Sequence, residues 1–245
     1  MALALGVVVV VALVVTLLGT SRSPSTPASV GAAAATSPGA SNASPGASPN
    51  TSPRAVPSAG SSASGAPAGY QTFSDQADHF SIAVPSEWRS VDPTSPGAAA
   101  AFEQIQAANP NFKRGFNGNL SSLLANDVKF LAVAPPSQAA EAANLNVIVK
   151  PAPGFVDADL GQIRNALPGE YTKIGATLLG ITTITLDGHQ ALKTTANLPV
   201  NTDLGNTLVA SQTQYVLGAN DFIYIITMTG TSPDLPTIAA TFQTN

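Results

Sequence analysis

The sequence predicts an α+β fold, an α/β/α sandwich in which helices cover both faces of a central, mainly antiparallel sheet. Two hairpin patterns predict the antiparallel pairing: apolar strands flank Asp187-Gly188, and a second pair flanks residues 218–220. Asp-Gly supplies the positive φ angles that a tight hairpin turn requires. Helical patterns precede and follow the hairpins along the chain, which indicates helices packed on the sheet in layers.

The 245-residue chain is expected to have three parts, of which the first is an apolar segment at residues 1–20. Residues 2–18 are almost all Ala, Leu and Val, and as a helix they would span roughly 26 Å, close to the ~30 Å hydrocarbon core of a membrane. We favour an uncleaved transmembrane anchor. The alternative is a cleaved signal peptide, with Gly19-Thr20-Ser21 as its small-residue cleavage site.

Residues 21–69 form the second part, which consists almost entirely of Ser, Thr, Pro, Ala and Gly. Large apolar side chains are nearly absent, so this segment cannot offset the entropy of ordering and is expected to be a disordered tether. Residues 70–245 form the third part. They carry all 14 acidic residues and every basic residue except Arg22 and Arg54, and their length suits a single globular domain.

The domain is expected to begin with two short strands, at residues 71–73 and 80–84. In the second strand large apolar residues alternate with Ser and Ala, which predicts one buried face. Pro85 should end this strand because proline cannot donate to the hydrogen-bond ladder. Trp88, the only tryptophan, follows three residues later and is expected to pack at the edge of the sheet.

Apolar residues at helical spacing predict helices over residues 98–108, 119–126, 156–167 and 235–242. The first is expected to stop at Asn109-Pro110 and the third at Pro168-Gly169, because both pairs disfavour continued helix. In the second helix Leu120, Leu123 and Leu124 are expected to face the core.

The remaining strands are predicted at residues 128–134, 145–150, 181–186, 190–198, 207–217 and 221–229. The last two should be joined by a turn at Gly218-Ala219-Asn220. In the final strand Tyr224 and Ile226 point to one face while Ile223 and Ile225 point to the other. A strand that is apolar on both faces is expected at the centre of the sheet, covered on both sides.

The pattern Phe80-x-Ile82-x-x-Pro85-x-x-Trp88 resembles the opening of the PsbP-like superfamily, and residues 224–229 followed by a short helix resemble its end. Within that superfamily the chain is most similar to actinobacterial surface lipoproteins of the LpqN type. The resemblance implies a PsbP-like sandwich, an extracytoplasmic location and a binding or assembly role without an agreed enzymatic activity. The chain has no Cys, so the lipobox cysteine is missing and the apolar segment would have to replace lipid anchoring.

Catalytic and metal-binding patterns give little support for an enzyme. No nucleophile elbow, P-loop, dinucleotide-binding, zinc-protease or EF-hand motif is present. Asp75, Asp78 and His79 lie close together but are expected to form a solvated turn. His189 follows the first hairpin turn and is expected to be exposed, while acidic residues at 157 and 159 complement a helix N-terminus. The sequence therefore predicts no cofactor, no metal site and no enzymatic activity.

A small set of aromatic and basic residues is the predicted contact surface for a partner or ligand. Basic and aromatic residues interleave at residues 112–116, which would form a loop if they contact a partner or a lipid headgroup; the alternative is two rim charges beside two core rings. Trp88 and Arg89 offer a second aromatic-basic pair if the indole is exposed. The full set is Trp88, Arg89, Phe112, Lys113, Arg114 and Phe116.

Composition and domain order together favour a non-catalytic binding or assembly module on the outer side of the cell membrane. The partner would be a cell-envelope protein or a glycan, and the net charge of −4 argues against nucleic acid. Two alternatives stay open. One is a carrier or sensor for a small apolar ligand lined by Phe102, Phe130 and Phe155, and the other is an unrecognised hydrolase. If the apolar segment is cleaved, the protein would be secreted.

Overall fold

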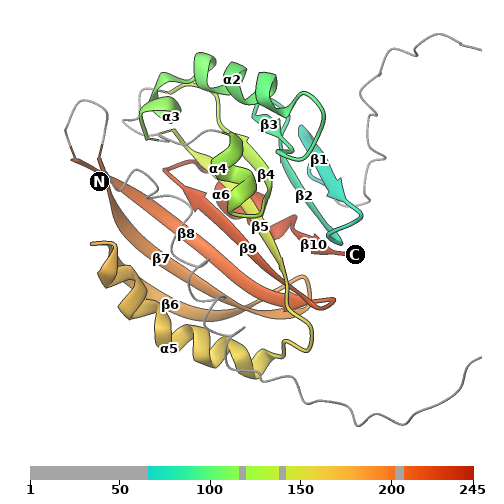
Figure 1. The fold of residues 1–245 in the computed structure, drawn as a ribbon, viewed down its shortest axis with the longest axis vertical. Coiled ribbons are helices and arrows are strands. Elements are labelled where there is room, and N and C mark those ends of the chain that lie inside the picture. The colour runs from blue at the N-terminus through green and yellow to red at the C-terminus, as the bar shows by residue number, and fades with distance from the viewer. Residues whose placement is uncertain (1–65, 116–119, 138–141, 202–206) are drawn as a thin grey trace, which may run out of the picture.

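A seven-stranded antiparallel sheet forms the middle layer of the protein (Figure 1). The computed structural model describes residues 66–115, 120–137, 142–201 and 207–245. The strands are Arg89–Val91 (β3), Val128–Val133 (β4), Asn144–Pro151 (β5), Thr177–Leu186 (β6), His189–Asn201 (β7), Thr207–Ala219 (β8) and Phe222–Thr229 (β9). They lie in the order β3-β4-β5-β9-β8-β7-β6, and the predicted α+β fold with a central antiparallel sheet is confirmed.

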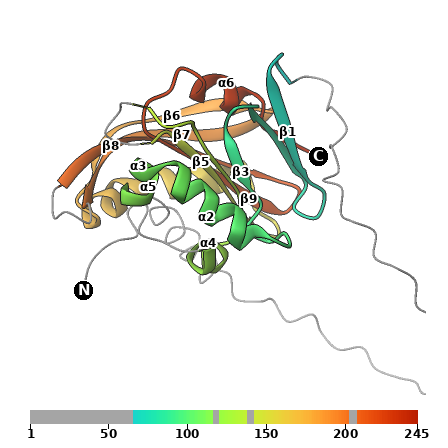
Figure 2. The same ribbon diagram turned by 90° about the horizontal axis from the view of Figure 1, so that it is seen from above.

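One face of this sheet is covered by a second, three-stranded sheet and a short helix (Figure 2). The small sheet consists of Tyr70–Asp75 (β1), Phe80–Pro85 (β2) and Gln243–Thr244 (β10), and the helix is Leu235–Ala240 (α6). Phe80, Tyr224 and Phe242 form the aromatic centre of this layer, with ring centroids 5.6–6.3 Å apart. The predicted final helix therefore covers the sheet together with β1, β2 and β10.

Among the described residues, four helices cover the opposite face of the central sheet (Figure 2). They are Ala98–Ala108 (α2), Pro110–Gly115 (α3), Leu120–Ala125 (α4) and Asp157–Lys173 (α5). Alternating side chains of a strand point to opposite faces, so β4 to β9 contribute to both cores, whereas β3 contributes only Val91 to one of them. Strand β9 lies fourth of seven in the sheet, and all its residues from Ile223 to Thr229 are buried, which confirms the predicted central strand.

The first predicted hairpin turn is confirmed and the second is shifted. Asp187 and Gly188 join β6 to β7 with φ angles of 48° and 77°. In the second hairpin the turn residues are Asn220 and Asp221, with φ angles of 53° and 63°, so the predicted turn at 218–220 is wrong. Gly218 instead lies within β8, where a Cβ atom would stand 2.1 Å from the ring of Phe155. Close packing against Phe155 therefore explains why residue 218 is a glycine.

Helix α5 does not stop at Pro168-Gly169 as predicted but continues to Lys173. Proline removes one hydrogen bond from the helix interior, yet both flanking turns are anchored in the core. Leu167 and Tyr171 are buried, and the Tyr171 hydroxyl lies 3.0 Å from the hydroxyl of Thr194 on β7. Tertiary packing therefore outweighs the local preference of proline.

Two further expectations about buried faces are wrong. All six residues of β2 are buried, where one buried face was expected, because β2 lies between β1 and β10 and the loop after α6 closes over it. Leu124 is 44% exposed although Leu123 is buried. Consecutive residues of a helix point about 100° apart at 3.6 residues per turn, and α4 turns Leu123 toward the core and Leu124 toward solvent.

The predicted anchor at residues 1–20 and the predicted tether up to residue 65 lie outside the described residues. Among the residues that the structure does describe, no helix combines the length and apolar character needed to cross a membrane.

Candidate functional site

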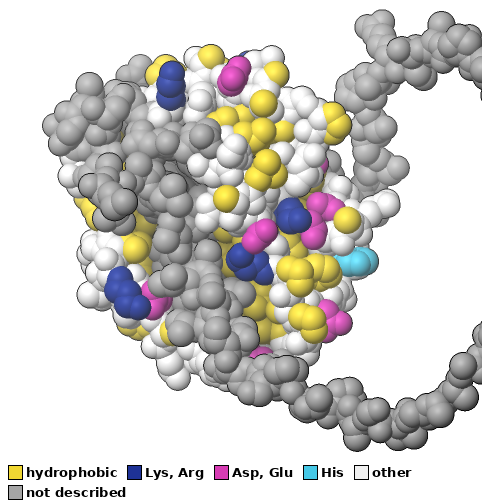
Figure 3. Space-filling model, in the orientation of Figure 1, with side chains coloured by type: hydrophobic (Ala, Val, Ile, Leu, Met, Phe, Trp, Pro, Cys, Tyr) yellow, Lys and Arg dark blue, Asp and Glu magenta, His cyan; other side chains and the backbone are white. Residues whose placement is uncertain are grey.

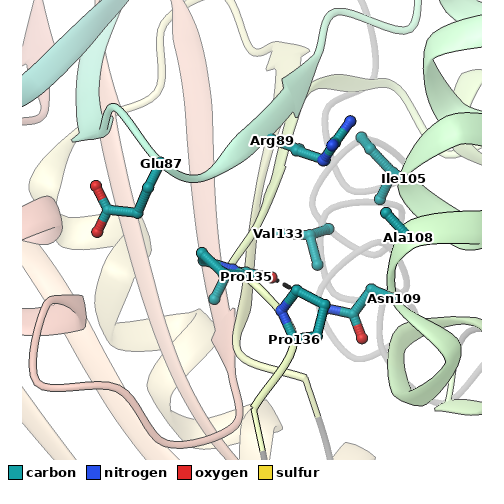
Figure 4. A pocket seen from close by; sticks show the side chains of 9 residues that line it. Glu87, Arg89, Ile105, Ala108, Asn109, Val133, Pro135 and Pro136 are labelled. Carbon is teal, nitrogen blue, oxygen red and sulfur yellow. Dashed lines mark hydrogen bonds between the residues drawn. The ribbon is translucent and has the colours of Figure 1, made fainter.

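A surface hollow of about 340 Å³ opens beside β3, one of the two edge strands of the central sheet (Figure 4). The C-terminal end of α2 forms one wall, and the segment that follows β4 forms another. The lining residues are Glu87, Arg89, Ile105, Ala108, Asn109, Val133, Ala134, Pro135 and Pro136. Elements far apart in the sequence therefore meet at this hollow.

The hollow has an apolar floor and a charged rim. Ile105 and Ala108 come from adjacent turns of α2, and Val133 comes from β4, directly opposite Arg89 in the β3–β4 register. Figure 4 shows the Arg89 side chain extending toward Ile105, whereas Glu87 turns away from it. Both charged residues are exposed. Such a surface can accept a chain segment that buries apolar groups and presents an acceptor to the guanidinium.

Asn109 holds the walls of the hollow together. It is 3% exposed, and its Nδ2 donates to the carbonyl of Ala134, 3.0 Å away, just after β4. Its Oδ1 accepts the backbone N–H of Phe112 at 3.1 Å, so the side chain also caps the N-terminus of α3. Asn109 was expected only to end the preceding helix, although Asn before Pro110 is also a typical helix start with proline at the first position.

The predicted contact residues divide into buried and accessible positions. Trp88 and Phe112 are each 3% exposed, so neither offers contact surface. Trp88 directly precedes the edge strand β3 and is buried with residues of β2 and β9, which fits the expected packing at the edge of the sheet. Phe112 is a core ring, as the alternative interpretation of residues 112–116 held. Arg89 and Lys113 are exposed. The Arg114 side chain and Phe116 lie outside the described residues.

Residues 112–115 belong to helix α3 and do not form a loop. The ring of Phe112 packs edge-on against Phe102 of α2, with centroids 6.3 Å apart. The backbone N–H of Lys113 donates to the carbonyl of Asn109. Lys113 therefore lies one helical turn beyond Asn109. Arg89 on β3 and Lys113 on α3 are thus two accessible basic residues on elements next to Asn109.

The acidic cluster between β1 and β2 forms a turn, as predicted. Asp75 accepts the backbone N–H groups of Ala77 and Asp78 at 2.9 and 3.0 Å. Asp78 pairs with Lys129 at 2.9 Å, and His79 is exposed. Among the described residues no group of three or more His, Cys, Asp or Glu side chains is placed to hold a metal ion.

Tyr224 joins this turn to the central sheet. Its hydroxyl donates to the carbonyl of Asp78 at 3.0 Å. Burial raises the pKa of Tyr224 to about 12; the hydrogen bond with Asn220 lowers it, and the charges of Asp78 and Asp75 raise it further. The phenol is therefore protonated at neutral pH and serves as a structural donor.

The carboxylates at the start of α5 act on the helix, as predicted. Asp159 Oδ2 accepts the backbone N–H of Val156 at 3.0 Å and so caps the first turn. Asp157 lies in the same turn, where a negative charge complements the helix dipole.

The apolar-ligand cleft expected from three phenylalanines is not formed. Phe102 packs in the core on the helix-covered face, and Phe130 packs in the core on the opposite face. The central sheet separates them, so they cannot line one cavity. Phe155 adjoins the first of these cores and packs on Gly218.

A known family model matches the first half of the domain. The model described as PsbP matches residues 68–163, from just before β1 into α5. This match confirms, over the residues that it covers, the resemblance to the PsbP-like superfamily that was based on the Phe80-to-Trp88 motif. No curated protein matches the chain.

Solved structures with a similar fold share little sequence. The solution structure of cyanobacterial PsbP (CyanoP) from Synechocystis sp. PCC 6803 is 16% identical, with a TM-score of 0.43 and coverage of 76% of this chain and 98% of that one. The crystal structure of LpqN, involved in cell envelope biogenesis of Mycobacterium tuberculosis, is 14% identical, with a TM-score of 0.38 and coverage of 68% and 83%. At these scores the likeness to the PsbP-like superfamily rests on the family match alone.

Proposed function

We propose that the protein is a non-catalytic binding or assembly module, held on the outer side of the cell membrane by residues 1–20. The observation that carries the proposal is the hollow beside β3, which combines an apolar floor, a proline-lined wall and the exposed Arg89. We propose a protein segment of the cell envelope as its occupant, with a carboxylate or carbonyl that accepts from the guanidinium.

The chemical character of the hollow supports binding over catalysis. Ile105, Ala108 and Val133 offer dispersion contacts but no group that transfers a proton or attacks a substrate. Asn109, the polar residue in the wall, uses both ends of its amide in hydrogen bonds to the protein backbone. These features match the apolar centre and polar rim of a protein interface.

The order of segments along the chain supports the location. An uncharged apolar segment precedes a Ser-, Pro-, Ala- and Gly-rich segment, and the PsbP-like domain follows. A flexible tether of about 50 residues has an end-to-end distance of roughly 40 Å, which lets a membrane-bound domain reach partners above the lipid surface.

Site-directed photo-crosslinking tests the contact surface. A benzophenone amino acid replaces Pro136 at the hollow in the full chain, and a control chain carries it at Ser211 on the other face of the sheet. We expect one crosslinked product from position 136 that is absent from position 211 and lost in Arg89→Glu. The same partner must crosslink back from its own contact residue. Equal products from both positions, or no effect of Arg89→Glu, would contradict the proposal.

Intact mass and protease accessibility test the location. The cell-associated chain should have the full 24.6 kDa mass if residues 1–20 are retained. Protease added to intact cells should degrade the domain, whereas a cytoplasmic control protein stays intact. A protected domain contradicts an outer location, and a shortened, released chain indicates the secreted alternative.

A further inference from the structure

Strand β6 forms a long edge of the central sheet. It lies last in the strand order and pairs only with β7. Within the described part of the chain, no hydrogen bond between main-chain groups joins its outer side to another segment. Alternate residues of an antiparallel strand direct their N–H and C=O groups to opposite sides, so about half of the main-chain groups of β6 are open to a further strand.

The sequence of β6 leaves this edge unprotected. Natural sheets blunt their edges with short strands, charged side chains or proline. The other edge of the sheet follows this rule, since β3 has three residues and begins with the exposed Arg89. In contrast, β6 has ten residues, and none of them is charged or a proline. An edge strand of this length and character is a template for pairing with another chain.

The side chains of β6 suit such pairing. Thr182, Thr183 and Thr185 are exposed, whereas Ile181 and Ile184 are half-buried and pack at the margins of the two cores, one on each face of the sheet. Threonine and β-branched side chains stabilise neighbouring strands through cross-strand contacts. A strand placed alongside β6 would therefore cover apolar surface on both faces at once.

The regular part of β6 is symmetric in length about one residue. It covers residues 180–186, because the register with β7 shifts just before it, and its middle residue is Thr183. An antiparallel pair of two such strands places Thr183 opposite its own copy and Ile181 opposite Thr185 of the second copy. Directly opposite residues lie on the same face of a sheet, so this register continues both faces of the sheet into the second copy.

Charge favours a second copy as the partner strand. A twofold axis places the residues nearest to it beside their own copies, and like charges directly opposite each other destabilise a sheet. The chain carries a net charge of −4, but β6 carries none. Figure 3 shows, on the face turned to the viewer, charged side chains only at scattered positions among uncharged ones. Two copies can therefore approach through β6 without opposing like charges in that strand.

We propose that two copies of the chain pair through β6, antiparallel and around a twofold axis at Thr183, into one continuous sheet with seven strands from each copy. A twofold contact uses the same edge of both copies, so the assembly closes at two. Because β3 lies at the opposite edge, the dimer leaves the hollow beside β3 open in each copy. That the dimer presents two partner sites rests on the proposed function; the pairing itself does not.

The expected dimer is weak in solution. Ten residues at roughly 3.4 Å each give an edge about 34 Å long, and contact through one strand per copy belongs to the small interfaces, below about 1,200 Å². Residues 1–20, held in a membrane as proposed above, would confine two copies to one plane. Such confinement raises their effective concentration, as a linker between two modules does.

Cysteine crosslinking tests the register, because the chain has no cysteine of its own. Thr183→Cys in the full chain, purified in detergent, should give a disulfide-linked dimer under mild oxidation. Opposite residues have Cα atoms about 4.5–5.5 Å apart, within the span of a disulfide. Ser211→Cys is the control, since it is exposed but lies on β8, two strands inward, and should stay monomeric. Ile181→Cys and Thr185→Cys should crosslink with each other in a mixture and much less when alone.

Charge exchange tests the pairing without a covalent bond. Thr183→Lys and Thr183→Glu each place two like charges at the axis, so each should weaken dimerisation by about tenfold or more in sedimentation equilibrium. An equimolar mixture of the two variants should recover it. Ser211→Lys is the matched control and should dimerise like the native chain. Because Thr183 is exposed, circular dichroism and the Tm of both variants should stay close to the native values.

Several outcomes would overturn the proposal. They are the absence of a native dimer at about 100 µM chain, equal crosslinking from positions 183 and 211, and a mixture of the Lys and Glu variants that stays monomeric. Dimerisation that neither charge weakens would assign the association to another surface, such as residues 1–20. A crosslink from position 183 to a different protein would mean that β6 pairs with a partner strand and not with its own copy.

Discussion

Replacement of Gly230, directly after β9, should lower stability for two reasons, its backbone conformation and its close packing. Its φ angle is +86°, and a Cβ atom would stand 2.9 Å from the Cα of Ala143. The first feature costs an L-residue about 1–2 kcal/mol, and the second adds overpacking of about 1–3 kcal/mol. We expect Gly230→Ala to lower the free energy of unfolding by about 2–5 kcal/mol in urea titrations.

Gly97 provides the matched control for this prediction. Its φ angle is +88°, but no atom lies within 4 Å of the position of a Cβ. Gly97→Ala should therefore lose only the conformational part, about 1–2 kcal/mol. If the two variants lose equal amounts of unfolding free energy, the close approach of Gly230 to Ala143 does not contribute to the effect of the substitution.

The raised pKa of Tyr224 predicts how the stability of the fold changes at high pH. Burial raises its pKa from 10 to about 12. Above pH 10 the unfolded chain releases this proton while the folded chain retains it, so the stabilisation present below pH 10 is lost progressively as the pH rises toward 12. Burial also raises the pKa values of Tyr171 and Tyr215, which act in the same direction.

Urea unfolding between pH 8 and pH 11.5 measures this effect. The free energy of unfolding of the native chain should fall across the upper part of that range. Tyr224→Phe should be less stable at pH 8, because it loses the hydrogen bond to the Asp78 carbonyl, and its slope above pH 10 should be smaller. An identical slope in the two proteins would contradict the assignment to Tyr224.

Among the strands and turns, the sequence predicted correctly those features that depend only on neighbouring residues. The Asp187-Gly188 turn fixed the first hairpin because only residues tolerant of positive φ fit there. The second turn was misplaced because Gly218 indicates a turn by composition, whereas its place in β8 is set by the ring of Phe155. A contact between residues 155 and 218 is not visible in the sequence near either residue.

At the candidate site, too, features set by neighbouring residues were predicted, whereas features set by tertiary packing were not. Arg89 was singled out from its neighbours and does line the hollow. Trp88 and Phe112 were selected for aromatic character, but their burial depends on the layers packed over them. The role of Asn109 was not predicted because its side chain joins the end of α2 to the segment after β4, a contact between distant parts of the sequence.

Helix α5 allows the competition between local preference and packing to be measured. Pro168 lies inside the helix, where proline is less favourable than alanine by up to about 3 kcal/mol. Because the flanking turns already hold the helical conformation, Pro168→Ala should stabilise the protein, by about 1–3 kcal/mol in urea unfolding. A destabilised Pro168→Ala would mean that the proline ring itself makes favourable contacts in the native structure. Gly169→Ala, at a position with no atom within 4 Å of a Cβ, is a control for helix propensity alone.

At the scale of the whole molecule, β9 couples the two cores that lie on opposite faces of the central sheet. Ile225 belongs to the core under α2 to α5, and Ile226 belongs to the core under β2 and α6. Trp88, the only tryptophan of the chain, lies in the second core and is therefore a fluorescence probe of that side alone. Far-UV circular dichroism reports on the helices and strands of both sides.

If the two cores unfold as one cooperative unit, a cavity on either side must lower the same transition. Truncation of a buried isoleucine to alanine costs about 2–5 kcal/mol, and we expect losses in this range for both Ile225→Ala and Ile226→Ala. In Ile225→Ala the Trp88 fluorescence midpoint in urea should shift together with the circular dichroism midpoint, although the cavity lies across the sheet from the indole. A fluorescence midpoint that stays at the native value while the dichroism midpoint falls would show that the central sheet separates two independently unfolding layers, since only the helix-covered core would have lost stability.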